Sequence, residues 1–358
     1  MYKLANTARH QLHGSAPGGD VYVLDLQRVP GNGGMVAALA SDRSLSLLDP
    51  SRLGQGPAAA TWTLEHRGAA TTLRPFGEGE GKALVCTAGE DGAVGVWDVR
   101  MRGDAARVAH FRASDAPILS MACSASTHTI AVGTELQNHA ASIFLWDVRA
   151  APTARAHYDQ AHSDDVTVLA FHPSDPALLL SGSTDGLVSL HDTRIVDEDD
   201  LTLQTLNHGA SIHHAGFLTD SLAFALSHDE RFALYDIAHD GHDGHDGHDG
   251  HDAAALTNLP SGDLRAVLGC QYVADVTPKT DGSGAIIGAG SQDRQSFELV
   301  FLAKDPARQS WLLDKGNRVG LPGAHGDDIV RSFCFFDREQ LVLTAGEDGA
   351  IKAWRPAD

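Results

Sequence analysis

Seven short apolar runs, each followed by a turn, recur along the chain and constrain its fold more than any other feature. They are Met35–Ser41, Leu84–Gly89, Thr129–Thr134, Leu178–Ser183, Leu222–Ser227, Ala285–Gly290 and Leu341–Gly346. Runs this apolar suit strands buried on both faces, which requires sheets stacked against one another. At 358 residues the chain exceeds the usual size of a single core, which predicts either two domains or a repeat array.

An acidic turn residue follows most of these runs, and a bulky residue comes six positions after it. The pairs are Asp42–Leu48, Asp91–Trp97, Asp185–His191, Asp229–Tyr235 and Asp348–Trp354. Successive repeat ends lie 49, 49, 45 and 44 positions apart, at Asp49, Asp98, Asp147, Asp192 and Asp236. This spacing is close to the ~40–45-residue period of four-stranded repeat units.

The repeats resemble those of WD40 proteins, and the likeness covers nearly the whole chain. Trp97-Asp98 and Trp146-Asp147 carry the Trp-Asp dipeptide of that family. The family's Gly-His pair is replaced by Asn207-His208, Ala161-His162 and Ala324-His325. The resemblance implies an all-β fold, a β-propeller with four antiparallel strands in each blade around a central channel. With seven apolar runs, we expect seven blades and a single domain over residues 1–358.

The two ends of the chain are expected to close this ring. Only Arg355–Asp358 follow Trp354, which leaves the last blade without a fourth strand. Residues 1–12 have no partner of their own, so we predict that Tyr2–Leu12 pair with the last blade and remove its exposed edge. Two blades depart from the pattern. Blade three has a longer turn at Glu135–Ala141, and blade six has Ser296–Ala303 in place of a Trp-Asp ending, with an outer strand near Trp311–Leu313.

Residues 239–252 form a His-Asp-Gly tract with five His-Asp pairs and no apolar residue. We expect a disordered loop insertion between the fifth and sixth blades. Zn²⁺, Ni²⁺ or Cu²⁺ could bind such residues, but histidines three positions apart lie ~9 Å apart in an extended chain. Nothing in the tract enforces wrapping around an ion, so we expect neither a metal nor another cofactor.

The charge balance, 27 basic against 47 acidic residues, argues against direct binding of nucleic acid. The net charge of −20 is compatible with a basic protein partner, and a surface that only maintains solubility explains it equally well. Cys86, Cys123, Cys270 and Cys334 form no CxxC pair and suit free thiols. No apolar run approaches the ~18–20 residues of a membrane span. We expect a cytosolic or nuclear protein, a monomeric ring within a larger complex.

A polar set recurs in several repeats: a histidine before the first strand, a hydroxyl in the second, the turn aspartate and a tryptophan. Its members are His66, Thr87, Asp91 and Trp97; His162, Ser181 and Asp185, with His191 in place of tryptophan; and His325, Thr344, Asp348 and Trp354. Such a set suggests a hydrolase, but its recurrence favours a structural role, and a triad would need an exposed nucleophile and an oxyanion hole. We expect no catalytic residues and no enzyme.

The loops before each first strand and the turns between second and third strands should meet on one face, which we call the top face. Six carboxylates there are not required by the polar sets and are expected to be free: Glu90, Asp164, Asp165, Asp327, Asp328 and Glu347. Arg331 is a further charge that the fold does not require. Clustered carboxylates attract Arg- or Lys-rich segments, and solvated loop ends are the alternative. We predict a non-catalytic scaffold for a basic partner such as a ribosomal protein, a histone or an assembly factor.

An Asp-x-Arg triplet ends three consecutive repeats and should place Arg100, Arg149 and Arg194 on the opposite face. In the WD40 family, segments similar to Leu84–Arg100 mark some substrate receptors of cullin-4 ubiquitin ligases. Leu179–Arg194 is similar too, with His191 in the tryptophan position. The resemblance therefore implies an alternative function, ligase docking through these arginines. Salt bridges at the rim are the simpler explanation.

Overall fold

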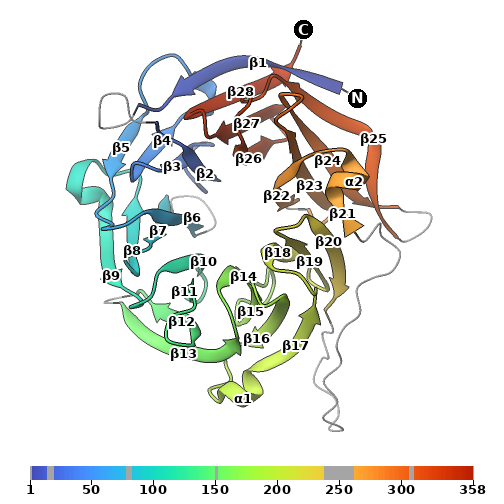
Figure 1. Cartoon of the computed structure of the whole chain (residues 1–358). Helices are drawn as coiled ribbons and strands as arrows, with labels where there is room; N and C mark the ends of the chain where they lie inside the picture. Colours follow the sequence, from blue (N-terminus) through green and yellow to red (C-terminus); the bar gives the residue numbers. More distant parts are fainter. Residues whose placement is uncertain are drawn as a thin grey trace.

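The computed structural model describes residues 2–13, 20–77, 83–149, 152–237, 262–279, 281–305 and 310–357. In this part of the chain, strands form five four-stranded sheets and one eight-stranded sheet, arranged radially around a central opening (Figure 1). The predicted all-β propeller is confirmed. The predicted loop insertion at 239–252 lies outside the described residues.

Each four-stranded sheet is a blade whose strands follow one another outward from the centre (Figure 1). Blade 1 contains β2 (Val23–Arg28), β3 (Val36–Ala40), β4 (Ser44–Leu48) and β5 (Ala60–Thr63). Blade 2 contains β6 (Ala70–Phe76), β7 (Leu84–Gly89), β8 (Ala93–Asp98) and β9 (Arg107–Arg112). Blade 3 contains β10 (Ile118–Ser124), β11 (Thr129–Thr134), β12 (Ala141–Asp147) and β13 (Thr153–His162). Blade 4 contains β14 (Val166–Phe171), β15 (Leu178–Ser183), β16 (Leu187–Asp192) and β17 (Thr202–Asn207). Blade 5 contains β18 (Ile212–Thr219), β19 (Leu222–Ser227), β20 (Arg231–Asp236) and β21 (Gly262–Asp263).

The eight-stranded sheet consists of two such units joined edge to edge, in the order β22-β23-β24-β25-β1-β28-β27-β26. Blade 6 contains β22 (Tyr272–Pro278), β23 (Gly284–Ser291), β24 (Ser296–Lys304) and β25 (Trp311–Pro322). Blade 7 contains β26 (Val330–Phe336), β27 (Leu341–Gly346), β28 (Ala350–Pro356) and β1 (Tyr2–Gln11). Divided in this way, the described strands form seven four-stranded units. Short helices lie in the connections: η1 (Pro50–Arg52), η2 (Gly103–Ala106), α1 (Glu198–Leu201) and α2 (Leu264–Leu268).

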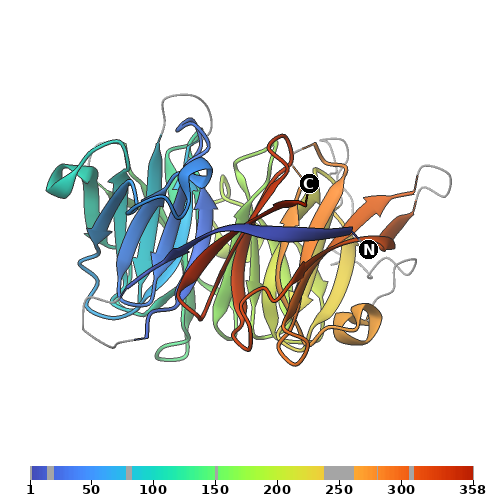
Figure 2. The ribbon, with the colours of Figure 1, turned by 90° about the horizontal axis from the view of Figure 1, so that it is seen from above.

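The N-terminal strand closes the ring, as the sequence predicted. β1 runs antiparallel to β28, with pairs from Leu4 opposite Pro356 to Gln11 opposite Ala350. Figure 2 shows β1 crossing the outer side of the molecule, with the two chain ends close together. At the inner side, β2 of blade 1 contacts β26 of blade 7. One contact was not predicted: Tyr2 and Lys3 pair in parallel with β25, which joins blades 6 and 7.

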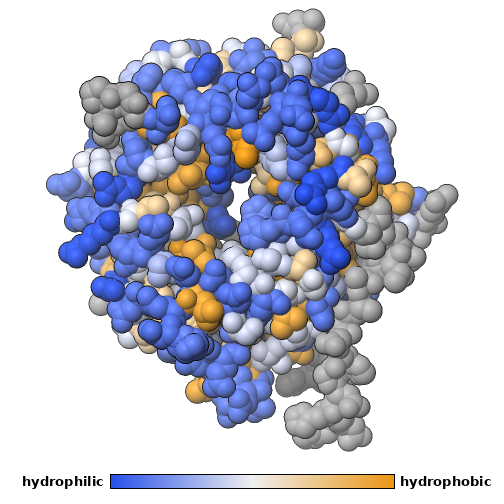
Figure 3. Space-filling model, in the orientation of Figure 1, coloured by the Kyte–Doolittle hydropathy of each residue, from blue (hydrophilic) through white to orange (hydrophobic). Residues whose placement is uncertain are grey.

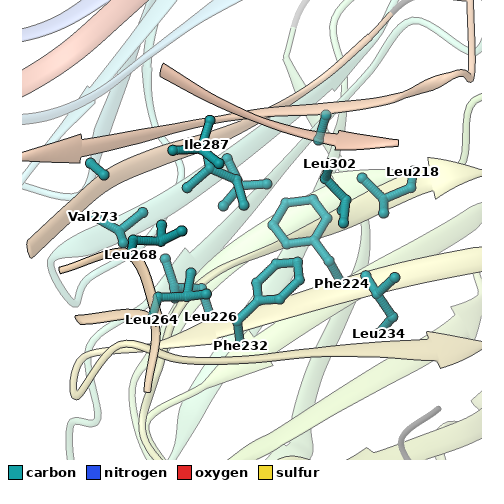
Figure 4. Packing of buried hydrophobic residues seen from close by; sticks show 14 of the residues in the cluster. Leu218, Phe224, Leu226, Phe232, Leu234, Leu264, Leu268, Val273, Ile287 and Leu302 are labelled. Carbon is teal, nitrogen blue, oxygen red and sulfur yellow. The ribbon is translucent and has the colours of Figure 1, made fainter. Parts of the chain in front are cut away.

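The second strand of each blade is the most buried, because both faces of its sheet pack against neighbouring blades. β3, β11, β15, β19, β23 and β27 are buried at every residue. Figure 4 shows the cluster between blades 5 and 6, where Phe224 and Phe232 face Ile287 and Leu302, and α2 adds Leu264. Each large side chain buried in this way contributes roughly 1.5–3 kcal/mol to folding. The layers between the blades thus act as the core of the ring.

Candidate functional site

The loop before the first strand and the turn after the second strand lie side by side at the top face. In blade 7 the Glu347 N–H donates to the Ile329 carbonyl at 3.0 Å, and in blade 2 the Glu90 N–H donates to the Ala69 carbonyl at 3.0 Å. Blade 4 repeats the contact, with the Thr184 N–H donating to Asp165 at 3.0 Å. One repeated backbone contact therefore fixes the side chains of both segments on one surface.

A buried polar chain underlies this surface in blade 7. His325 is 3% exposed, and its Nδ1 lies 2.6 Å from Asp348 Oδ1 while its Nε2 lies 2.8 Å from Thr344 Oγ1. Trp354 Nε1 donates to the same hydroxyl at 2.9 Å. A neutral imidazole protonated on Nδ1 satisfies all three contacts, since the Thr344 hydroxyl then donates to Nε2. The chain joins the top loop, β27 and β28 in one network.

The charges of this chain are set by burial and by hydrogen bonds. Burial, opposed by Asp348, lowers the pKa of His325 and keeps its ring neutral. Burial also opposes ionisation of Asp348, but the hydrogen bonds from His325 and Ala350 and the charge of Lys352 lower its pKa to about 2. Thr344 is fully buried, so no substrate reaches its hydroxyl. The arrangement suits a structural fastener and lacks an accessible nucleophile.

Blades 2 and 4 contain the same chain. In blade 2, His66 lies 3.0 Å from Asp91 and 3.2 Å from Thr87, and Trp97 Nε1 donates to Thr87 at 3.1 Å. In blade 4, His162 lies 3.0 Å from Asp185 and 2.7 Å from Ser181, whose hydroxyl lies 2.7 Å from His191 Nε2. The second nitrogen of His191 meets the Thr202 hydroxyl at 3.1 Å, a partner that the sequence did not suggest.

The structure corrects the expectation that six top-face carboxylates are free, because four of them are bound by groups from other segments of the chain. Glu90 accepts from the Ala69 N–H, Asp165 from the Leu136 N–H and Asp327 from the Gln295 amide. Glu347 forms an ion pair with Arg331, whose Nε lies 2.9 Å from Oε1. Asp165 and Asp327 thereby fasten the turn of the preceding blade, which spacing within one repeat could not reveal.

The remaining two carboxylates have no such fastening role. Among the residues that the structure describes, the Asp164 side chain accepts only from the N–H of Asp165, at 2.9 Å. The Asp328 side chain is exposed and has no hydrogen-bonded or ionic partner among the described residues. Both residues belong to loops that precede a first strand, in blades 4 and 7.

The first strand of every described blade has an irregular register near its beginning, which displaces one residue from the pairing. The displaced residues are Leu24, Thr71, Leu119, Thr167, His213, Ala274 and Arg331. Bulges of this kind re-aim side chains. Arg331 is thus the blade 7 member of a ring of seven bulge residues, a repeated feature that the sequence analysis missed.

A polar cluster follows these bulges on the innermost strands. Asp25 of β2 accepts from Arg74 of β6 at 3.2 Å and from the Ser332 hydroxyl of β26 at 3.0 Å. On β18 and β22, His214 Nδ1 lies 3.7 Å from Asp275. Figure 3 shows a hollow at the centre of the ring with hydrophilic residues around it. The signal was present in the sequence as Val-x-Asp at 23–25 and 273–275, aligned with Ile-His-His at 212–214.

Burial determines the protonation of this cluster. It raises the pKa of both Asp25 and Asp275, an effect that the charge of Arg74 opposes. Burial and then neighbouring histidines lower the pKa of His213 to about 3, while burial and then Arg74 lower that of His214 to about 4. At neutral pH these histidines add no positive charge to the centre of the ring.

On the opposite face, each predicted docking arginine is bound by the aspartate of its own triplet. Arg100 Nε donates to Asp98 at 2.8 Å and Arg194 Nε to Asp192 at 2.8 Å. Arg149 donates to Asp147 in the same way, and its hydrogen bonds lower the pKa of that carboxyl to about 2. Asp263 and Arg265 form a fourth pair of this geometry, but they lie at the top face, in the segment before β22, where Arg265 also donates to the Asp229 carbonyl at 3.1 Å.

Comparison with known proteins assigns the family. A family model described as WD domain, G-beta repeat matches residues 155–192 and 317–355. An uncharacterized WD repeat-containing protein of Saccharomyces cerevisiae is 34% identical over 273 residues, which cover 76% of this chain and 64% of that protein. A second, from Schizosaccharomyces pombe, is 32% identical over 276 residues, covering 76% of this chain and 79% of that protein. The chain belongs to the WD repeat-containing proteins.

Within this family, the last blade and Gly269–Val273 resemble WD repeat-containing protein 89. The homolog of that protein from Dictyostelium discoideum is 24% identical over 199 residues, 55% of this chain and 50% of that protein. WD repeat proteins generally act as protein-interaction scaffolds and are typically not enzymes. The chain spans 64% of the length of the Saccharomyces relative.

The described part of the chain contains neither a metal cluster nor a membrane-spanning helix. No three of its His, Cys, Asp or Glu side chains are placed to hold a metal ion. None of its helices has the length and apolarity needed to cross a membrane. All four cysteines are free thiols, as predicted, and burial raises the pKa of Cys334 to about 12 and that of Cys270 to about 11. Neither of these two thiols is activated as a nucleophile.

Proposed function

We propose that this chain is a non-catalytic scaffold whose acidic top face binds a basic peptide or protein. Candidate partners are a ribosomal protein, a histone or an assembly factor. We further propose that the blades form one domain, a monomeric ring within a larger complex in the cytosol or nucleus, with no direct contact to nucleic acid.

One observation supports the proposal: five of the six predicted top-face carboxylates form no ion pair with a described residue. Glu90 and Asp165 accept from backbone N–H groups and Asp327 from a neutral amide, so their hydrogen bonds leave the negative charge in place. Asp164 and Asp328 have no ionic partner among the described residues. Of the six, only Glu347 forms an ion pair within the described part of the chain, with Arg331.

The two histidines at the bulge of β18 add no positive charge that would cancel it. His213 and His214 are neutral at physiological pH because their pKa values are lowered to about 3 and 4. Uncompensated carboxylates on a rigid ring favour Arg- and Lys-rich segments and raise their rate of encounter. We therefore expect the affinity for a basic partner to fall as the salt concentration rises.

Affinity purification with mass spectrometry tests the proposal. The comparison is between the natural chain and the variant Asp164→Lys with Asp328→Lys. The matched control is Asp199→Lys with Asp200→Lys, which makes the same charge change at α1, in the connection between the third and fourth strands of blade 4. Basic partners that are lost with the top-face variant and kept with the control support the proposal. Partners that survive the top-face variant at low salt refute it.

The alternative is that the chain is a substrate receptor of a cullin-4 ligase. It is favoured by one observation: Arg100, Arg149 and Arg194 are held in the same geometry on three consecutive blades. If this alternative holds, Arg100→Ala with Arg149→Ala abolishes co-purification of the ligase adaptor. Absence of adaptor from preparations of the natural chain ends this alternative.

A further inference from the structure

The seam where the ring closes contains a polar cavity of about 380 Å³. Its walls come from three segments that are distant in sequence: Thr7–Arg9 of β1; Pro50, Ser51 and Leu53–Gln55 around η1; and Ala353 with Arg355 of β28. Only the closed ring brings these segments together. We propose that this cavity is a binding site for a compact oxyanion, a phosphoryl group above all.

The local backbone shapes the cavity. The pairing of β1 with β28 is irregular between Asn6 and Ala8, and the displaced Thr7 donates its hydroxyl proton to the Ala353 carbonyl at 3.3 Å. Gly54 lies against β1 with φ +77°, and a Cβ on it would approach the Arg9 carbonyl oxygen to 2.7 Å. The blade 1 loop can therefore pack this closely on the closing strand only with glycine at this position.

The charge of the lining points to an anion. Two arginines, Arg9 and Arg355, line the cavity, and none of its ten lining residues is acidic. The Ser51 hydroxyl in the lining donates to the carboxylate of Asp49 at 2.6 Å, so the arginines are the donors left for a ligand. A lining without an acidic residue is unusual for a chain with 47 acidic and 27 basic residues. A guanidinium carries five N–H donors in a planar fork that matches phosphate and carboxylate oxygens.

Both arginines retain donors for a ligand. Arg9 is half exposed, donates to the Gln11 side chain at 2.5 Å and lies 3.9 Å from Asp348. Arg355 donates through Nη1 to the Glu339 carbonyl at 2.9 Å. These contacts occupy a minority of the ten donors that two guanidinium groups provide. The volume lies at the lower end of the range for ligand pockets, which suits a phosphoryl group with few further atoms.

A ligand held by β1, β28 and the η1 loop binds the closed ring and not the opened chain, so it must stabilise the fold. The first test is the melting temperature of the full chain with pyrophosphate, against sodium chloride at equal ionic strength. At a concentration ten times Kd we expect Tm to rise by about 2 °C with pyrophosphate. A phosphoserine peptide forms a second arm that distinguishes a phosphorylated segment from a free phosphate.

Matched variants decide the result. Arg9→Gln with Arg355→Gln should abolish the rise, and Arg52→Gln should retain it, because Arg52 lines the adjacent 230 Å³ cavity and not this one. If the double variant does not fold, Ser51→Asp places a carboxylate in the cavity without touching strand pairing and should also abolish the rise. A rise with either phosphate source that these variants remove supports the site. Equal rises with chloride, or rises that survive the variants, overturn it.

Discussion

The buried carboxyl group of Glu230 should make the stability of this protein fall as pH rises. Glu230 lies in the turn between β19 and β20, where blades 2, 4 and 7 have a glycine, and it has φ 62°. It is 7% exposed. Oε1 accepts from the Val273 N–H at 3.1 Å, whereas Oε2 is buried and has no hydrogen-bond partner among the described residues.

The magnitude follows from the pKa of this carboxyl. Burial raises it from 4.5 to about 7, an effect that the Val273 N–H and Arg265 oppose and that Asp263 and Asp229 reinforce. Between the two pKa values the folded state binds more protons than the unfolded state, so stability is greatest at low pH and is lost as pH rises. The loss between pH 5 and pH 8 is on the order of 2–3 kcal/mol.

Glu230→Gln removes the titration and keeps the acceptor for Val273. We expect the variant to be more stable than the natural chain by roughly 2–3 kcal/mol at pH 8 and by less than about 1 kcal/mol at pH 5. Urea denaturation at both pH values measures this difference. Glu135→Gln is the control, because Glu135 is exposed in the corresponding turn of blade 3 and its change should stay within about 0.5 kcal/mol. If Glu230→Gln changes the free energy of unfolding equally at both pH values, the raised pKa of Glu230 is contradicted.

Three further predictions concern the fasteners of the ring. Thr344→Val should lower the free energy of unfolding, measured by urea denaturation, by about 1–3 kcal/mol, because it leaves His325 and Trp354 without their shared hydroxyl. Trp354→Phe removes only one donor to that hydroxyl, so the loss of this hydrogen bond should lower the free energy of unfolding by less. Deletion of residues 1–12 should expose the edge of β28 and yield aggregates on size-exclusion chromatography; a monodisperse monomer with unchanged Tm would contradict ring closure by β1. Gly349→Ala should lower Tm more than Gly33→Ala, since both have positive φ but only at Gly349 would the new Cβ meet a backbone oxygen, that of Val21. Equal effects on Tm would show that this contact is unimportant.

The repeated part of the architecture could be predicted because each repeat supplies the same local information. The spacing of His325, Thr344, Asp348 and Trp354 predicted a polar chain, and the structure brings these four side chains together. The closing strand followed from a last blade with three strands and an N-terminal segment without a partner. In both cases the relevant contacts are made within one blade.

Contacts between blades could not be predicted in this way. Asp165 accepts from the Leu136 N–H of blade 3, and Asp327 binds Gln295 of blade 6, so both were wrongly expected to be free. The cluster of Asp25, Arg74 and Ser332 joins three blades whose strands are up to 307 positions apart in sequence. Such partners depend on how neighbouring blades are placed against one another, and the pattern within one repeat does not contain that information.

Titration of an arginine-rich peptide into the protein tests most directly whether the top face binds a basic partner through its uncompensated carboxylates. Kd would be measured for the natural chain, for Asp164→Lys with Asp328→Lys and for Asp199→Lys with Asp200→Lys, at low and physiological salt. We expect the top-face variant to weaken binding at low salt by roughly tenfold or more, about 1.4 kcal/mol, while the control on the opposite side stays close to the natural chain. Equal weakening by both variants would contradict it, because the peptide would then sense net charge and not this surface.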